Sequence, residues 1–173
     1  MDVLTAIHTR RSVRHYLDRP VPERLVDEIL RAAMAAPSAS NQQPWEFVVI
    51  NDPTIIREIP EFNPAAFALK TAPLAIVVCG NLERELPQAK NFWVQDCSAA
   101  IQNILLAAHA CGLGAVWLGS YPLHHLVERI QTLIGLPESV IPLAVIGVGY
   151  PAEQKEPQDR FDPSRIHWNR WQP

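Results

Sequence analysis

Glycine is scarce in this chain of 173 residues, which has seven, and cysteine and methionine are scarcer, at three and two. No two cysteines are spaced as Cys-x-x-Cys, and His-Glu-x-x-His, Gly-x-Ser-x-Gly, a phosphate-binding loop and Gly-x-Gly-x-x-Gly are all missing. These absences exclude the common zinc, redox and dinucleotide motifs. Because Cys79, Cys97 and Cys111 lie far apart inside apolar runs, we expect reduced thiols that bind no metal.

Long apolar runs are missing as well. No stretch of about 18 uninterrupted apolar residues could span a membrane, and residues 1–9 lack the basic region and apolar run of a secretory signal. The formal net charge of -3 argues against a nucleic acid as the main partner, because such binders usually present a broad basic surface. We therefore expect a cytoplasmic protein that binds neither membrane nor nucleic acid.

The composition, 48% hydrophobic and 19% charged, is that of a globular protein, and the length fits one domain. Apolar residues at helical spacing predict three helices, and short apolar runs that end in turn residues predict four strands covered on both faces. This mixed order predicts an α+β or α/β protein. The helices are expected at residues 23–36, at 93–111 and within 123–137, where Gly135 stops the last one. The strands are expected at 45–52, 73–81 and 140–150, and a strand followed by a loop at 114–121.

A basic cluster lies near the start of the chain, in the sequence TRRSVRHY at residues 9–16. If this segment is extended, Arg10, Ser12 and Arg14 point one way and Arg11 points the other. Two guanidinium groups and a hydroxyl group on one face suit a phosphate, whose oxygens match the forked donors of arginine. The alternative is a solvated, charged end of a helix.

Five polar residues lie between two prolines in APSASNQQPW, residues 36–45. Amide groups offer donors and acceptors side by side, which suits the edge of a pyrimidine-like ring. An ordinary polar connection between a helix and a strand explains the same residues equally well.

Three of the seven glycines lie in GLGAVWLGS, residues 112–120. Glycines at the end of a strand let backbone N–H groups approach a flat ligand closely. Simple termination of the strand is the alternative.

The segment from residue 150 onward has four prolines, scattered charges and no sustained periodicity. Its large apolar side chains are costly to leave in water, so we expect an arm that packs against the body or a partner subunit. Arg160, in PQDRFD, is by default a surface charge. The apolar residues are Phe161, Ile166, Trp168 and Trp171.

Taken together and in this order, RRSVR, PSASNQQPW, GLGAVWLG and GYPAE followed by DRFD resemble the nitroreductase family of FMN-dependent oxidoreductases. The resemblance spans nearly the whole chain. It implies an α+β fold, an α-β-α sandwich in which helices flank a mainly antiparallel central sheet, as a single FMN-binding domain over residues 1–173. It also implies a homodimer with FMN at the subunit interface, in which an extended C-terminal arm, residues 150–173, embraces the partner subunit.

The resemblance assigns cofactor-binding roles to residues in all four motifs. At the FMN phosphate and the adjoining ribityl chain it places Arg10, Arg11, Ser12, Arg14 and Arg160. It places five residues of the partner subunit against the flavin ring, namely Pro37, Ser38, Ala39, Asn41 and Gln43. It places a third segment under the ring, with a backbone N–H of this segment directed at flavin N5. The residues of this segment are Trp117, Leu118 and Gly119.

Three positions need separate mention. Gly119 stands where some nitroreductases have Glu, and Gln158 stands where relatives often have a basic residue near the phosphate. Asp96, on the central helix, matches a polar position that faces the flavin. The resemblance therefore implies a flavin site with local differences from its relatives.

The implied activity is that of an enzyme, an FMN-dependent NAD(P)H oxidoreductase. NADH or NADPH gives a hydride to N5 of FMN, and an electron-poor acceptor such as a nitroaromatic or a quinone then takes the electrons in a ping-pong cycle. No side chain is assigned a catalytic role and no metal is expected. Two alternatives stay open: a flavin reductase or flavin-fragmenting enzyme, and a dimeric FMN-binding protein without turnover.

Overall fold

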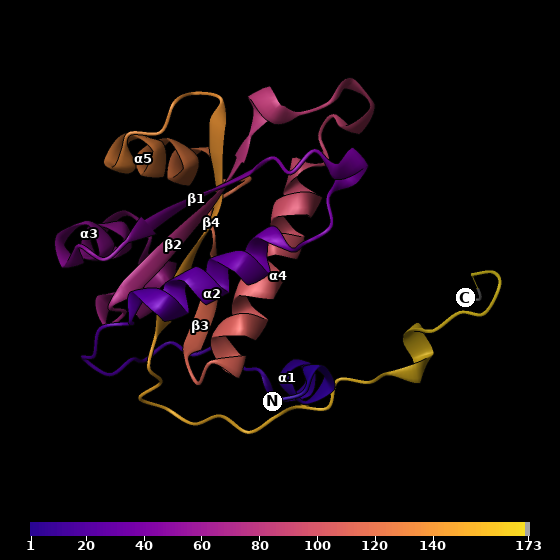
Figure 1. Cartoon of the computed structure of the whole chain (residues 1–173), viewed down its shortest axis with the longest axis horizontal. Coiled ribbons are helices and arrows are strands. Elements are labelled where there is room, and N and C mark those ends of the chain that lie inside the picture. Colours follow the sequence, from indigo (N-terminus) through magenta and orange to yellow (C-terminus); the bar gives the residue numbers. More distant parts are fainter. Residues whose placement is uncertain (172–173) are drawn as a thin grey trace.

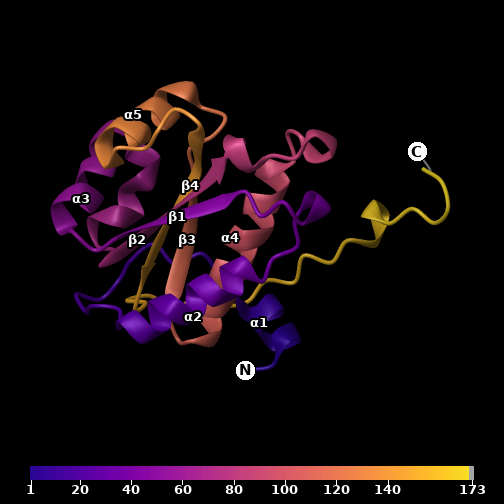
Figure 2. The ribbon, with the colours of Figure 1, turned by 45° about the horizontal axis from the view of Figure 1, so that its top comes forward.

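A four-stranded sheet with helices on both faces forms the centre of the computed structural model, which describes residues 1–171 (Figures 1 and 2). The helices are α1 (Val3–Thr9), α2 (Glu23–Met34), α3 (Pro53–Phe62), α4 (Trp93–Ala110) and α5 (His124–Ile134). The strands are β1 (Trp45–Ile50), β2 (Leu74–Asn81), β3 (Gly114–Gly119) and β4 (Val140–Gly149). Short 3-10 turns are η1 (Ala39–Asn41), η2 (Pro64–Lys70), η3 (Leu82–Arg84), η4 (Pro87–Ala89) and η5 (Pro163–Arg165).

The strand order in the sheet is β1-β2-β4-β3, and every pair of neighbours is antiparallel. β1 and β3 are therefore the two edge strands. This arrangement confirms the predicted α+β sandwich with a mainly antiparallel central sheet.

Two apolar layers cover the sheet, because successive side chains of its strands point to opposite faces. On one face, Ile76 and Val78 of β2 pack with the buried sides of α2 and α4. On the other face, Val77 packs with α3, η2 and α5. The prediction that the apolar strands are covered on both sides is confirmed.

The long helices lie close to the predicted positions. α2 ends at Met34, two residues earlier than expected, and α4 ends at Ala110. α5 stops at Gly135, whose φ of 68° is left-handed and therefore suits glycine. α1 and α3 were not expected from the sequence, and each begins at an aspartate, Asp2 or Asp52, that accepts hydrogen bonds from backbone N–H groups of the first turn.

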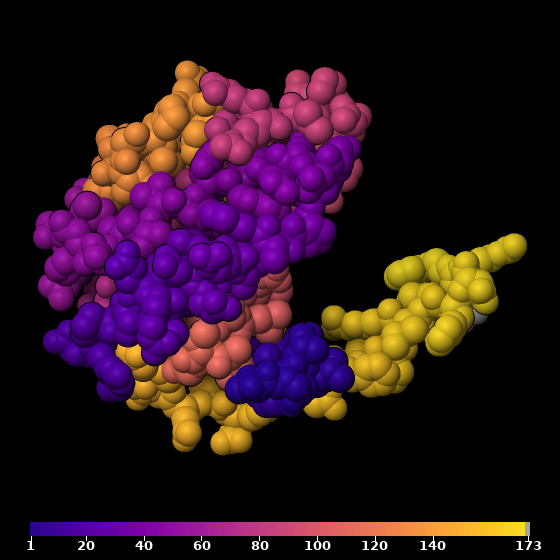
Figure 3. Space-filling view, in the orientation of Figure 1, coloured from indigo at the N-terminus to yellow at the C-terminus, as the bar shows by residue number. Residues whose placement is uncertain are grey.

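The C-terminal arm begins along the body and then leaves it. Tyr16 pairs with Pro151, and the backbone N–H of Ala152 donates to the carbonyl of His15 at 2.9 Å. Glu153, Lys155 and Glu156 still contact residues 11–14, and beyond them the arm extends away from the body beside α1 (Figure 3). Its aromatic side chains are largely exposed in the single chain, with 74% for Phe161 and 78% for Trp168.

Cys79 and Cys97 are buried free thiols, and Cys111 is a half-buried one. Burial, and then the charge of Glu46, raise the pKa of Cys79 to about 12, which makes this thiol unreactive at neutral pH. None of the helices within residues 1–171 combines the length and the apolar character that crossing a membrane requires.

Candidate functional site

A cavity of about 880 Å³ lies between the end of α1 and the start of the C-terminal arm. It brings together residues that are about 150 positions apart in the sequence. The five basic side chains that line it are Arg10, Arg11, Arg14, Lys155 and Arg160, and Ser12, Gln158 and Phe161 line it as well. All five residues that the resemblance assigns to the phosphate and ribityl region therefore share one cavity.

The segment that carries these arginines is fixed against β3. The backbone N–H of Val13 donates to the carbonyl of Ala115 at 3.1 Å, and Ser12 forms a parallel bridge with Ala115. The side chain of Val13 is buried and lies against Gly114, where any Cβ atom would come within 2.6 Å of it. Only glycine at position 114 allows this approach, so the sequence GLG is needed for packing as well as for the turn.

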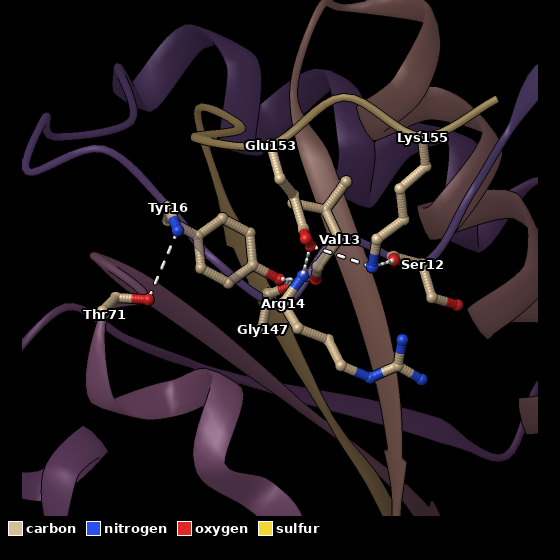
Figure 4. A network of polar contacts seen from close by, with 8 residues as sticks. All are labelled: Ser12, Val13, Arg14, Tyr16, Thr71, Gly147, Glu153 and Lys155. Atoms are coloured by element: carbon tan, nitrogen blue, oxygen red, sulfur yellow. Dashed lines mark hydrogen bonds and ion pairs between the residues drawn. The ribbon is translucent and has the colours of Figure 1, made fainter.

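The arm holds the same segment from the other side (Figure 4). Glu153 accepts a 2.7 Å hydrogen bond from the backbone N–H of Arg14, and Lys155 donates to the carbonyl of Ser12 at 2.9 Å. Lys155 also pairs with Glu153 at 3.0 Å. The hydrogen bond from Arg14, and then Lys155, hold the pKa of Glu153 below its ordinary value, so this carboxylate stays charged. The Arg14 side chain extends away from Glu153, which leaves its guanidinium group for the cavity.

The electrostatics of the cavity favour an anion. Among residues 1–171, Lys155 is the only one of the five basic lining residues that forms an ion pair. Burial, and then the charges of Arg160 and Arg11, lower the pKa of Arg10, although an arginine still keeps its proton. Asp159 lines the cavity as well, but it accepts a hydrogen bond from the Phe161 N–H and, within residues 1–171, forms no ion pair with these cations. Cations that crowd one another in this way are stabilised when a phosphate binds among them.

α1 is attached to the C-terminal end of α4 by one polar contact. Thr9 Oγ1 lies 2.8 Å from His109 Nε2 and also donates to the carbonyl of Thr5 at 2.6 Å. Because the single hydroxyl proton is used on Thr5, the ring N–H of His109 donates to Thr9. Burial, and then the charge of Arg10, lower the pKa of His109, which favours this neutral ring. The contact fixes the position of Arg10, the next residue.

The edge of β3 leads away from the basic cavity. The carbonyl of Ala115 points to the edge, where it binds Val13, whereas the N–H of Ser120 points inward and donates to Leu143 of β4. Since backbone groups alternate along a strand, the N–H of Gly119 faces the edge. A Cβ atom at Gly119 would meet no atom within 4 Å, and Trp117 is 37% exposed. This edge therefore offers a backbone donor in open space, while the Leu118 side chain points into the core.

The loop between α2 and β1 lies beside the N-terminal end of α4. Pro37, Asn41 and Gln43 are exposed, and Ser38 and Ala39 are partly exposed. Asp96, expected to face a flavin, is instead buried behind the loop. Its carboxylate accepts hydrogen bonds from the Ala39 N–H and from Gln42 Nε2, both at 2.8 Å. Gln42 has no assigned role in the sequence prediction, because a glutamine in a polar loop gives no sign that it is buried.

One chain does not bring all the predicted residues together. The loop is attached at Asp96, near the start of α4, and the basic cavity is attached at His109, near its end. These two positions are 13 residues apart, which corresponds to about 20 Å along a helix. Figure 1 shows α1 and the α2-β1 loop near opposite ends of α4. Within this chain, the cavity and the edge of β3 form one group and the loop forms another.

No metal site is evident within residues 1–171, where no three His, Cys, Asp or Glu side chains are grouped as metal ligands would be. The fold and the cavity together define an α+β protein with a basic pocket beside an open sheet edge. The chain belongs to the nitroreductase family, whose sequence pattern matches residues 7–68 and 61–150.

Individual relatives agree with this assignment. A protein of Methanothermobacter thermautotrophicus is 54% identical over 99% of this chain and 88% of its own length, and its provisional name is NADH dehydrogenase/NAD(P)H nitroreductase. The NADH dehydrogenase of Thermus thermophilus is 33% identical over 96% of this chain and 95% of its own. The solved structure of an FMN-dependent nitroreductase from Clostridium difficile superposes with a TM-score of 0.90, at 29% identity, over 98% of this chain and 100% of its own.

Proposed function

We propose that this chain is an FMN-dependent NAD(P)H oxidoreductase of the nitroreductase type. In this proposal the whole chain, residues 1–173, acts as one FMN-binding domain within a homodimer. FMN lies between the basic cavity and β3 edge of one subunit and the α2-β1 loop of the other. Support comes from the family membership and from relatives named as FMN-dependent or NAD(P)H-dependent reductases.

The observation that carries the proposal is the set of basic side chains in one cavity, of which Arg10, Arg14 and Arg160 form no ion pair within residues 1–171. These donors fit the phosphate of FMN. From Ala115, beside this cavity, to Gly119 is four residues, or about 13 Å along an extended strand. That distance is comparable to the length of an extended flavin mononucleotide, so the ring reaches the exposed N–H of Gly119. The residues present therefore fit this cofactor.

When bound, FMN supplies the redox chemistry, accepting a hydride from a nicotinamide and passing electrons to an acceptor. The protein binds this cofactor and orients it. Arg10, Arg160 and Ser12 hold the phosphate, and Arg14 places a positive charge nearer the ring. The Gly119 N–H, which faces the open edge of β3, would donate to the ring. Because residue 119 has no side chain, the backbone rather than a carboxylate faces the ligand.

A second subunit completes the site in this proposal. The loop that carries Ser38, Ala39 and Asn41 is attached at one end of α4 and the basic cavity at the other, about 20 Å apart, and we propose that the loop facing the flavin comes from the second subunit. Apolar side chains on α1, such as Leu4 and Ile7, are exposed in the single chain, as are those of the arm. A partner that covers α1 and α4 and is embraced by the arm buries these surfaces.

We further propose a ping-pong reaction with an electron-poor acceptor such as a nitroaromatic or a quinone. The oxidised nicotinamide leaves before the acceptor binds, because both need the same open side of the ring.

The experiment is the spectroscopy of the purified protein. We expect a yellow dimer that loses its visible flavin absorbance when NADH or NADPH is added without oxygen, and regains it when a nitroaromatic or quinone follows. Flavin that stays yellow identifies a binding protein without turnover, and reduced FMN that is released into solution identifies a flavin reductase. Protein that is colourless and cannot be reconstituted with FMN contradicts the proposal.

Arg10→Ala directly tests whether the basic cavity binds the phosphate of FMN. It removes one unpaired cation from the cavity, so we expect FMN affinity to fall about ten-fold or more, since hydrogen bonds to charged groups contribute about 1.5–3 kcal/mol. Arg24→Ala is the matched control, because Arg24 is an exposed residue on α2 that does not line the cavity. Equal FMN affinities for the two variants would remove Arg10 from the site.

A further inference from the structure

Two buried polar residues, Asp96 of α4 and Gln42 of the α2-β1 loop, form a closed hydrogen-bond network behind the loop. Asp96 is only 4% exposed, and each of its carboxylate oxygens accepts a hydrogen bond. Oδ1 accepts from the backbone N–H of Ala39 and Oδ2 from Gln42 Nε2, both at 2.8 Å. Within residues 1–171 no Lys, Arg or His forms an ion pair with this carboxylate, so the two N–H donors and its place in the first turn of α4 stabilise its charge.

Gln42 uses every polar group of its side chain in the same network. Nε2 donates to Asp96 and, at 3.1 Å, to the carbonyl of Ala89, while Oε1 accepts from the backbone N–H of Leu86 at 3.0 Å. This one amide therefore connects the loop, the segment between η3 and η4, and α4. The direction of each bond is fixed, because the donor side faces two acceptors and the acceptor side faces a donor.

The loop held by this network has an unfavourable backbone. Ser40, Asn41 and Gln43 have φ angles of 49°, 55° and 47°, in the left-handed region that side-chain-bearing residues seldom adopt. Two local bonds support the turn: Ser38 Oγ accepts from the Gln43 N–H at 3.0 Å, and Asn41 Oδ1 accepts from Gln43 Nε2 at 2.9 Å. Left-handed residues in such number persist only where surrounding contacts fix them, and they concentrate at functional sites.

We propose that Asp96 and Gln42 are positioning residues that hold the loop in its flavin-binding conformation before the cofactor arrives, and that the Asp96 charge tunes the flavin from behind Ala39. The inference rests on the proposed function. In it, the loop faces the flavin of the other subunit, and the carboxylate lies one hydrogen bond behind that face. A negative charge there opposes the negative charge that reduction adds to the ring, so it lowers the reduction potential.

Asp96→Asn tests both parts. The introduced asparagine still accepts from the Ala39 N–H, but its NH₂ group then faces the NH₂ group of Gln42. Rotating the Gln42 amide does not solve the conflict, because its oxygen is needed by Leu86 and its nitrogen by Ala89. We expect the Ala39 amide to exchange its hydrogen about ten- to one-hundred-fold faster in the FMN-free protein. This range corresponds to loss of the bond between Gln42 and the charged Asp96 carboxylate, which holds the loop.

Two double variants separate positioning from general damage. In Asp96→Asn with Gln42→Glu, the new amide donates to the new carboxylate, and the charge and the bond to Leu86 are both kept, while the Ala89 carbonyl loses its donor. In Asp96→Asn with Ser40→Gly, glycine removes the cost of the left-handed residue. We expect either change to restore slow exchange in part. Asp52→Asn is the control, because it is the same chemical change at the exposed cap of α3, where asparagine serves equally well.

The measurements are hydrogen exchange of residues 38–43 without FMN, FMN affinity, and the reduction potential of the bound flavin. We expect Asp96→Asn to loosen the loop, weaken FMN binding and shift the potential to a more positive value, with Asp52→Asn unchanged. If the Ala39 exchange rate and the potential both match those of the wild type, the inference is overturned, as it is if neither double variant slows the exchange. Failure of the wild type to bind FMN would refute the proposed function instead, while the exchange rates would still decide the role of Asp96 in the loop.

Discussion

Gly114 at the start of β3 lies directly against Val13 of the segment that carries the arginines. A Cβ atom at Gly114 would be 2.6 Å from the Cβ of Val13 and within 2.8 Å of both of its methyl groups. Since Val13 is flanked by Ser12 and Arg14, this contact sets how deeply the basic segment sits beside the strand. The cavity therefore depends on the absence of a side chain at position 114.

Gly114→Ala is expected to lower the stability of the protein. The added methyl group overpacks a buried contact, at a cost of about 1–3 kcal/mol, and it pushes Arg10 and Arg14 out of place. Thermal unfolding should show a melting temperature about 2–4 °C lower per kcal/mol for a domain of this size. FMN affinity should fall in the same variant.

Gly119→Ala is the matched comparison at the other end of β3. A methyl group there meets no atom of this chain within 4 Å, so the melting temperature should stay that of the wild type. FMN affinity should nevertheless fall, by about ten-fold for 1.4 kcal/mol, because the methyl group projects where the flavin ring is proposed to lie. A Gly119→Ala protein with unchanged affinity would place the ring elsewhere.

Arg160→Ala is expected to weaken FMN binding and to make the affinity less dependent on salt. Arg160 lines the same cavity as Arg10, and the one hydrogen bond that it donates within residues 1–171, to Gln158 at 3.3 Å, is long. Its guanidinium group is therefore available to a phosphate. Fluorescence titration at two salt concentrations measures both effects.

Arg165→Ala is the control for that variant, because Arg165 lies in the same arm but pairs with Asp162 at 3.1 Å and does not line the cavity. Gln158→Lys makes the opposite change, adding a cation to the cavity wall, and should tighten FMN binding. Equal affinities for the Arg160 and Arg165 variants would show that the arm does not reach the phosphate.

The sequence predicts best the elements whose burial is periodic. α4 and the four strands lie where expected because their apolar residues face a core on one or both sides. α1 escaped prediction because Ala6 is its only buried residue, so the helix has no apolar stripe toward its own chain. α3 contains Pro60, which argues against a helix, although Asp52 followed by Pro53 is a good signal for a helix start.

The site is less predictable than the fold, since it depends on contacts between distant parts of the chain. Spacing indicates that Arg10, Ser12 and Arg14 share one side, but only the resemblance connects them to Arg160. The structure brings the four together, and it adds Lys155, whose role is to hold Ser12. Arg11 also lines the cavity, although an extended segment predicts that it points away, because its guanidinium group turns to the Glu156 carbonyl of the arm.

Tyr16 supplies a pH-dependent part of the stability. Its hydroxyl is buried and lies 2.6 Å from the Val13 carbonyl and 3.0 Å from that of Gly147. Burial, chiefly, raises the pKa of Tyr16 above its ordinary value of 10.0. The folded state thus holds this proton more tightly than the unfolded state does. The resulting stability is fully present below pH 10 and is lost as the pH rises further.

Tyr16→Phe should therefore cost about 1–2 kcal/mol at pH 7, where two carbonyl groups lose a buried partner. Above about pH 10 the difference in unfolding free energy between the wild type and this variant should shrink, because only the wild type loses stability through Tyr16. Urea denaturation of both proteins, at neutral pH and at a pH above 10, measures this difference in unfolding free energy. Tyr150→Phe is the control, and a constant difference for the Tyr16 variant would rule out the linkage.

Trp168→Ala tests the part assigned to the arm in the proposed dimer. Trp168 is 78% exposed in the single chain, which is unusual for tryptophan and suggests an anchor for a partner. If it is buried in the dimer, its loss should raise the dissociation constant about thirty-fold, in line with an interface residue that contributes about 2 kcal/mol. Sedimentation velocity over a dilution series measures this, and Trp168→Phe, which keeps an aromatic ring, should lie between the variant and the wild type. FMN affinity should fall with dilution in the alanine variant, because the second subunit completes the proposed site. An alanine variant that stays dimeric over the same range as the wild type would mean that Trp168 does not anchor the partner.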